Sequence, residues 1–166
     1  MIQLAQIETP VGGFAYAHQD GIMLRTRFMR EEPIEVFESM LNATMVRSEF
    51  GQSLQIEDAV QAYFAGDDTK MAALNIRPTG SSFQLQAWTA LRAVPFGHTV
   101  SYGELALAIG RRHSSRAMGA AMGANPIPLV VPCHRVIGRS GALVGFGAGI
   151  DLKIALLRHE GRLLSL

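Results

Sequence analysis

The first part of the chain alternates short apolar runs with turn-forming residues. Apolar side chains recur in residues 2–7, 13–18 and 22–28, and Pro, Gly and Asp fill the breaks at residues 9–12 and 19–21. Runs of this length between such residues are typical of strands joined by tight turns. The pattern therefore predicts three strands in a small antiparallel sheet.

Helical spacing replaces this alternation after residue 33. Apolar residues at intervals of three and four predict a helix from Pro33 to about Glu49 and a second helix over residues 56–64. Residues 67–80 are polar and are predicted to be irregular. We place a domain boundary near residues 77–80, which gives predicted domains at residues 1–78 and 82–166.

The second half begins with helices whose starts are marked by capping residues. Ser81 or Ser82 is a candidate N-cap for the first of them. Ser101 and Glu104 have the spacing of a capping box, so a second helix is predicted to begin there and to end at Gly110.

A third helix of this half is predicted from Ser114 or Ser115 to just before Asn125, because the proline after Asn125 disfavours helical backbone. Two short helices joined by a tight turn predict a helix-turn-helix. Four elements are expected to follow: a valine-rich strand over residues 129–131, a second short strand, a glycine-rich loop over residues 141–149 and a closing helix over residues 150–159.

Charge is divided unevenly, although the net charge is only +1. Residues 1–80 hold 6 Lys/Arg and 11 Asp/Glu, a net charge of −5, whereas residues 81–166 hold 9 and 3, a net charge of +6. A basic half suits a polyanionic partner such as nucleic acid. A solvated basic face without a partner is the alternative that charge leaves open.

The sequence has no long uncharged apolar run, and no basic segment followed by an apolar stretch at its start. It therefore predicts neither a membrane span nor a secretion signal. The single cysteine excludes an internal disulfide and any site that needs two thiolates. We expect a cytoplasmic protein of bacterial type that acts at the nucleoid.

The helix predicted after Ser115 has one large and one small face. Met118 and Met122 share the face that we expect to be buried. Each glycine costs a helix about 1 kcal/mol relative to alanine, so close approach to another surface is expected in return. That surface is either a neighbouring helix or DNA, and the basic surroundings favour DNA. The small face holds Gly119, Ala120, Gly123 and Ala124, with Arg116 beside them.

Cys133 follows Pro132 and precedes His134 and Arg135. A lone cysteine is usually a buried, inert residue, but neighbouring cations and donors favour the nucleophilic thiolate. His134 is placed to accept the thiol proton, directly or through water, and Glu160 is a candidate to orient its imidazole. The alternatives are a structural histidine and a glutamate in solvent.

The run from Asn125 to Val136 closely resembles the active-site motif of the O6-alkylguanine-DNA alkyltransferases. The resemblance covers most of residues 82–166, and it includes Trp88 and the His159-Glu160-Gly161 ending at family-like spacing. It implies an α+β fold, in which a small N-terminal antiparallel sheet with helices, of RNase H-like type, precedes a mostly helical winged-helix or helix-turn-helix domain. The N-terminal half matches the family only in general character.

The resemblance implies roles for five residues in the chemistry. Cys133 corresponds to the alkyl acceptor, His134 to the water-mediated base and Glu160 to the carboxylate that orients it. Asn125 corresponds to the residue that braces the turn beside the active site. Tyr102 corresponds to the tyrosine that crowds the 3′ phosphate and donates a proton to the leaving guanine.

The implied partner is double-stranded DNA that carries O6-alkylguanine, entered from the minor groove. Arg116 corresponds to the finger that fills the place of the extruded nucleotide. A protein thiol cannot reach the O6 atom of a stacked base, so the nucleotide must be flipped out. We expect a monomer that can bind cooperatively along DNA. The residues assigned to DNA binding are Arg116, Ala117, Gly119, Ala120, Gly123, Ser101 and Arg135.

The implied substrate pocket departs from the family pattern in the glycine-rich loop. Gly147 stands where serine is common, Phe146 where tyrosine is frequent and Ala148 where glycine is usual. The missing serine hydroxyl removes one hydrogen bond to the base. No metal and no cofactor are expected. The residues assigned to the pocket are Met122, Pro128, Val136, Phe146, Gly147, Ala148 and Lys153.

The expected reaction is an irreversible, single-turnover transfer to Cys133, because a thioether is not readily cleaved. Two other functions compete with it. A lesion-binding protein of the same fold would flip the base without repairing it, but such proteins lack the acceptor thiol. A thiol-dependent hydrolase or peroxidase would turn over repeatedly and would need no DNA.

Overall fold

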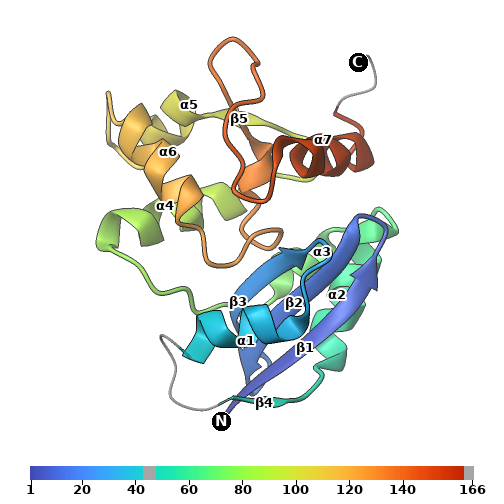
Figure 1. Cartoon of the computed structure of the whole chain (residues 1–166). Coiled ribbons are helices and arrows are strands. Elements are labelled where there is room, and N and C mark those ends of the chain that lie inside the picture. The colour runs from blue at the N-terminus through green and yellow to red at the C-terminus, as the bar shows by residue number, and fades with distance from the viewer. Residues whose placement is uncertain (43–47, 163–166) are drawn as a thin grey trace. The chain divides into compact units, whose positions relative to one another are not determined.

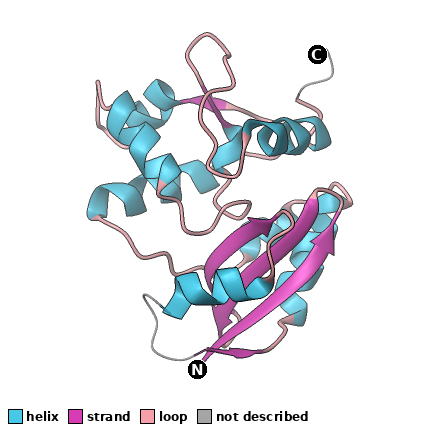
Figure 2. Ribbon diagram, in the orientation of Figure 1, coloured by secondary structure: helices cyan, strands magenta, loops and turns pink. Residues whose placement is uncertain are grey.

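The computed structural model describes residues 1–42 and 48–162. The chain divides into two compact units, Met1–Pro78 and Thr79–Leu166. The first unit is built around a sheet and the second mainly from helices, which gives the α+β class (Figure 2). Within the described residues, every helix falls short of the length and apolarity that crossing a bilayer requires.

The sheet of the first unit confirms the three predicted strands and adds a fourth. The three antiparallel strands lie in the order of the chain, and β4 pairs in parallel with β1 at the edge. Gly12 and Gly21 have φ values of 111° and 78°, which suits glycine in the tight turns between the strands. The strands are β1 (Ile2–Thr9), β2 (Gly12–Gln19), β3 (Ile22–Met29) and β4 (Ser48–Phe50).

Helices lie on both faces of this sheet (Figure 1). Phe37 and Leu41 of α1 (Ile34–Asn42) pack on Leu4 and Ala17 in the buried core. On the other face, Tyr16 of β2 bonds Glu57 of α2 (Leu54–Phe64).

Two predictions for this unit were wrong. The first helix does not continue to Glu49, because β4 occupies residues 48–50 and pairs with β1; residues 43–47 lie outside the described part of the chain. Residues 67–80 are not irregular throughout, because α3 (Thr69–Ala73) forms there. The Asp67 carboxylate accepts bonds from the Thr69 amide and hydroxyl at 2.9 and 2.6 Å, which fixes the turn into that helix.

The second unit contains the predicted capped helices. Ser81 accepts a bond from the Gln84 amide, and Ser101 accepts one from the Glu104 amide at 3.1 Å, so both starts are capping boxes. The short strands β5 and β6 pair in parallel. The elements are α4 (Ser82–Arg92), β5 (Val100–Ser101), α5 (Tyr102–Ala108), α6 (Ser115–Gly123), the 3-10 turn η1 (Cys133–Arg135), β6 (Val136–Ile137) and α7 (Ile150–His159).

Residues 129 and 130 form a turn and Val131 makes only an isolated bridge with Pro128, so the valine-rich strand predicted over residues 129–131 was wrong. The prolines at 126 and 128 have no amide hydrogen to donate to a sheet. Leu129 has a φ of +76°, and the Val131 amide closes the turn on the Ile127 carbonyl at 2.9 Å. The apolar side chains of this run are buried by the turn and not by strand pairing.

Trp88 anchors α6 to α4. Its indole Nε1–H donates to the Ala121 carbonyl of α6 at 2.9 Å, and the ring is buried. A Cβ atom on Gly80 would lie 2.7 Å from the same ring, so this position admits only glycine without a shift. The contact holds α6 so that Met118, Ala121 and Met122 face inward.

Candidate active site

Cys133 lies at the start of η1, directly after the proline-rich turn. Its thiol is free and only 8% exposed. The Asn125 amide group donates to Cys133 Sγ at 3.2 Å and to the Val131 carbonyl at 2.8 Å. The Asn125 Oδ1 atom accepts a bond from the Ile127 amide at 3.0 Å. One side chain therefore fixes both the turn and the sulfur, as the predicted bracing role requires.

The buried position of Cys133 works against the thiolate that its neighbouring cations and donors favour. Burial raises the pKa of Cys133 above its ordinary value. The Asn125 bond, the charge of Lys153 and the amides of Cys133 and His134 oppose this shift without cancelling it. The resting site consequently holds a neutral thiol, and a base is needed to generate the nucleophile.

His134 is completely buried and pairs with Glu160. Its Nε2 atom lies 2.7 Å from Glu160 Oε1, and neither side chain is exposed. A carboxylate only accepts hydrogen bonds, so Nε2 carries the proton and Nδ1 is the acceptor in the neutral ring. Nδ1 is buried and has no hydrogen-bond partner in the described part of the chain. Burial lowers the pKa of His134, with Glu160 opposing, so the ring is neutral and its lone pair is open.

Glu160 is held by more than the imidazole. Arg135 Nε donates to both carboxylate oxygens at 3.2 and 3.0 Å, and Nη2 donates to Oε1 at 3.0 Å. The Gly97 amide donates to Oε2 at 3.2 Å. Burial raises the pKa of Glu160, but the bonds and charges of His134 and Arg135 bring it down to about 2. Glu160 is therefore a carboxylate at every physiological pH.

Arg135 does not belong to an exposed DNA-binding surface, which corrects its predicted role. The residue is 3% exposed. Its Nη1 atom donates to the Val94 carbonyl at 2.8 Å, and the rest of the guanidinium faces Glu160. Burial and these bonds turn the side chain into the interior, where DNA cannot reach it.

Tyr102 and Lys153 bond the same backbone carbonyl. The Tyr102 hydroxyl donates to Val144 O at 3.1 Å, and Lys153 Nζ donates to Val144 O at 3.2 Å and to Val136 O at 2.5 Å. Burial raises the pKa of Tyr102 and lowers that of Lys153, and the negative charge of Cys133, when the thiol is ionised, raises both. Two of the predicted site residues thus meet at the loop between β6 and α7.

Comparison with known proteins shows to which family a chain with this site belongs. The family model described as 6-O-methylguanine DNA methyltransferase, DNA binding domain, matches residues 82–162. The methylated-DNA–protein-cysteine methyltransferase of Mycolicibacterium paratuberculosis is 40% identical over 165 residues, which cover 98% of this chain and 94% of that protein. This chain belongs to the methylated-DNA–protein-cysteine methyltransferase family.

Two further relatives show how far this likeness extends. The methylated-DNA–protein-cysteine methyltransferase of Salmonella typhimurium is 50% identical over 109 residues, 66% of this chain and only 64% of that protein's length. The crystal structure of Mycobacterium tuberculosis OGT in complex with DNA is similar with a TM-score of 0.79 and 35% identity, and the match covers 96% of this chain and 93% of that one.

The α6 helix of this methyltransferase-family chain presents the small face that the sequence predicts. Gly119 is half-buried, and the other small-face residues and Arg116 are exposed. A Cβ atom on Gly123 would meet nothing within 4 Å in the described structure, and one on Gly119 would only touch the Tyr102 ring at 3.9 Å. Packing within the described residues therefore does not require these glycines, which argues against a neighbouring helix as their reason.

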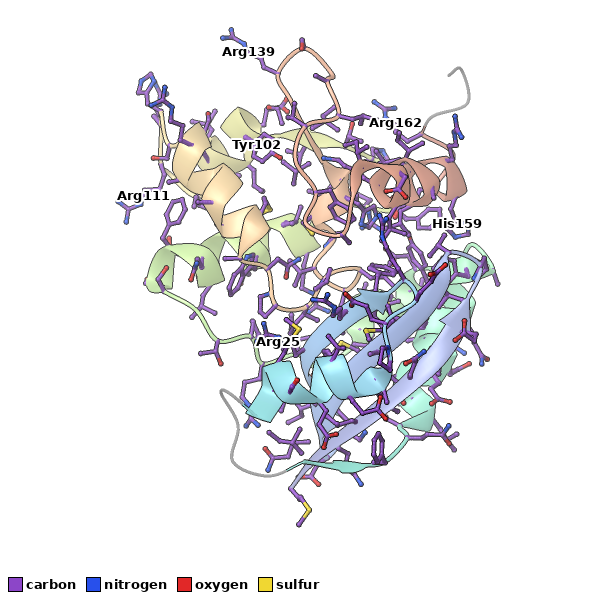
Figure 3. The ribbon with its side chains drawn as sticks, in the orientation of Figure 1. Arg25, Tyr102, Arg111, Arg139, His159 and Arg162 are labelled. Carbon is purple, nitrogen blue, oxygen red and sulfur yellow. The ribbon has the colours of Figure 1, made fainter. Side chains whose placement is uncertain are left out.

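Exposed cations lie on two loops of the second unit. Arg111 and Arg112 lie in the loop between α5 and α6, and Arg139 lies in the turn after β6. Figure 3 shows Arg111 pointing away from the helices and Arg139 projecting from the loop. Ser101, assigned to DNA binding, is half-buried and uses its hydroxyl to cap α5.

The residues assigned to the substrate pocket differ in exposure. Met122 and Val136 are buried, Pro128, Phe146 and Ala148 are half-buried, and Gly147 is exposed. A Cβ atom on Gly147 would meet nothing within 4 Å in the part of the chain described here. Their shared role around a base stays a prediction. Residues 1–42 and 48–162 also contain no group of three or more His, Cys, Asp and Glu that could hold a metal ion.

Sequence reasoning missed the pairing of Arg135 with Glu160. A signal for it exists, because residues 81–166 hold only three acidic side chains. Glu104 is used in the capping box of α5, and Asp151 lies in the first turn of α7. Glu160 is the acid that remains, and a buried arginine needs such a partner.

Proposed function

We propose that this chain repairs alkylated DNA by transferring an alkyl group from O6 of guanine to Cys133 Sγ. One observation carries the proposal: the Cys133 thiol, held by Asn125, directly precedes a neutral His134 that is bound to Glu160 through Nε2 and has its buried Nδ1 unpaired within the described residues. A nucleophile, a base and an orienting acid are the parts that nucleophilic catalysis needs. The names of the relatives support this reaction.

The transfer conserves atoms and charge. His134 Nδ1 takes the thiol proton, directly or through one water, and the sulfur attacks the alkyl carbon. The sulfur–carbon bond forms as the carbon–O6 bond breaks, and the electron pair of the broken bond stays with the guanine. Tyr102 donates the proton that the guanine then needs, and the thiol proton held on His134 returns to Tyr102, so that neither side chain is left charged. The products are normal guanine and an S-alkylcysteine.

The protein is consumed in this reaction. The carbon–sulfur bond of a thioether is not readily cleaved, and the sequence contains no second cysteine that would assist removal of the alkyl group. Each molecule therefore repairs one base. This stoichiometry separates the proposal from a thiol hydrolase or peroxidase, which would turn over.

The substrate is double-stranded DNA, and the damaged nucleotide is flipped from the minor groove into the site. Flipping costs a few kcal/mol and less for a poorly paired base, which favours alkylguanine over guanine. In this proposal α5 and α6 form the helix-turn-helix, β5, β6 and the loop after β6 form a winged-helix element, and the first unit is an RNase H-like support. The exposed small face of α6 suits backbone and groove-shape contacts, with Arg116 filling the vacated stack.

The proposal is tested with duplex DNA that carries radiolabelled O6-methylguanine. Label is expected on the protein at no more than one equivalent, and peptide mapping is expected to find it on Cys133. Cys133→Ala should abolish transfer while DNA binding is retained, and unmodified duplex serves as the control. Repeated turnover, or release of labelled methanol, would contradict the proposal. Binding of the lesion without any transfer would indicate a lesion-recognition protein instead.

A further inference from the structure

The proposed reaction gives no role to the buried cation Arg135. Arg135 is 3% exposed, and its guanidinium contacts both oxygens of Glu160 as well as the Val94 carbonyl. The Phe96 ring lies 5.9 Å from the guanidinium carbon. A guanidinium buried at this depth is costly unless its charge is matched, and the Glu160 carboxylate matches it.

The same carboxylate also holds the base of the proposed reaction. His134 Nε2 and Arg135 Nη2 both bond Glu160 Oε1, at 2.7 and 3.0 Å. A buried carboxylate that faced the imidazole alone would favour the protonated ring. A protonated His134 has no lone pair, and it could not accept the thiol proton. The position of Arg135 on this carboxylate therefore bears directly on the state of the base.

We propose that Arg135 is a positioning residue that compensates the charge of Glu160, so that His134 stays neutral and offers its Nδ1 lone pair to the Cys133 thiol. The guanidinium also fixes the direction of Oε1, because its planar fork contacts both carboxylate oxygens. This inference rests on the proposed function, since it concerns the same proton transfer.

The groups around His134 agree with this assignment. Burial lowers the pKa of His134, Glu160 raises it, and the charges of Arg135 and Lys153 lower it further. Lys153 Nζ bonds the carbonyls of Val136 and Val144, and its charge acts on the Cys133 thiol. Arg135 is the cation that contacts the carboxylate itself.

The experiment measures the His134 titration by imidazole NMR, with the signal assigned by its loss in His134→Gln. The wild type, Arg135→Gln and Arg135→Lys are compared, and Arg162→Gln removes an exposed positive charge from the same unit as the control. The pH dependence of alkyl transfer from free O6-benzylguanine is measured on the same proteins, so DNA binding does not enter.

Arg135→Gln is expected to raise the His134 pKa by at least about one unit, because the Glu160 charge is no longer compensated. Transfer needs the neutral ring, so the pH at which the rate falls on the acidic side should rise by the same amount. One pH unit below the new pKa, the rate should be about tenfold lower than its plateau value. Arg135→Lys keeps the charge and should titrate near the wild type, but with slower transfer, because lysine lacks the two-point contact. Arg162→Gln should match the wild type in both measurements.

Two results would overturn the inference. The first is an unchanged His134 titration in Arg135→Gln. The second applies even where that variant does not fold: a wild-type His134 that is charged at neutral pH, or that carries its neutral-state proton on Nδ1. Failure of the proposed function has a different signature, because the wild type would then titrate as expected but transfer no alkyl group.

Discussion

The two units bury histidines in opposite ways. In the first unit, His18 Nε2 contacts the Gly51 carbonyl at 3.0 Å, and its Nδ1 accepts the Gly21 amide at 3.3 Å. In the second unit, His134 has Glu160 on Nε2 and no partner on Nδ1 among the residues described. Both rings are buried. Both nitrogens of His18 have hydrogen-bond partners, whereas His134 Nδ1 has none in the described part of the chain.

The polar groups around each ring follow the same division. The Tyr16 hydroxyl, next to His18, donates to Glu57 Oε1 and accepts the Ser53 amide, both at 2.9 Å. That network ties β2 to α2 and leaves its hydroxyl with a partner on each side. An unpaired buried polar atom lowers the free energy of unfolding, so the unpaired nitrogen in the second unit indicates a role in catalysis. The paired groups around His18 are explained by stabilisation of the fold alone.

Substitution of each histidine by glutamine is the strongest test of this difference between the two units. His134→Gln removes the base and should slow alkyl transfer from free O6-benzylguanine by about 10²–10⁴-fold. His18→Gln should leave that rate unchanged and lower the free energy of unfolding by about 1–3 kcal/mol, because buried partners lose their bonds. Single-turnover kinetics and urea denaturation measure the two effects. A similar loss of transfer in both variants would mean that His134 acts only through the fold.

Acid should act on the second unit through Glu160. Its pKa of about 2 lies below the ordinary 4.5, so the folded state binds this proton less readily than the unfolded chain. The resulting stability, at most about 3 kcal/mol, is present above pH 4.5 and is lost as the pH falls towards 2.

Denaturation of the wild type and Glu160→Gln between pH 7 and pH 2 tests this linkage. The difference in unfolding free energy between the two proteins should shrink over the acidic part of this range. A difference that stays constant down to pH 2 would show that the Glu160 proton is not linked to folding.

The smallest effect concerns the glycines of α6. Gly123→Ala should stabilise the fold by about 0.5–1 kcal/mol, because alanine is the better helix former and its Cβ would meet nothing within 4 Å in the described structure. The same change should weaken binding to duplex DNA if this face approaches the groove. Denaturation and fluorescence anisotropy with a labelled duplex measure the two effects. Undiminished affinity would remove Gly123 from the proposed interface.

Local signals predicted most elements correctly. Alternation and turn glycines located β1, β2 and β3, and the serine caps located α4 and α5. The β4 strand has only three residues and exists through pairing with β1, which no local pattern encodes. The run at residues 129–131 shows the reverse error, since an apolar run was read as a strand although the neighbouring prolines favour a turn.

The sequence predicted the residues of the candidate site and one of its contacts, that of His134 with Glu160. The motif identified Cys133, His134 and Glu160, and the structure brings His134 and Glu160 together. Burial of the thiol and of Arg135 depends on how the turn, η1 and α7 pack, which the sequence does not state. The assignment of Arg135 to DNA binding requires an exposed side chain, whereas its bonds to Glu160 hold it inside.

Trp88, through its bond to the Ala121 carbonyl, is an intrinsic fluorescent reporter of the second unit. Trp88 is the only tryptophan in the chain, so all indole emission comes from the side chain that holds α6. Indole emission responds to the polarity and hydrogen bonding around the ring. Melting of the second unit, or displacement of α6 by a bound duplex, can therefore be followed in the unlabelled protein.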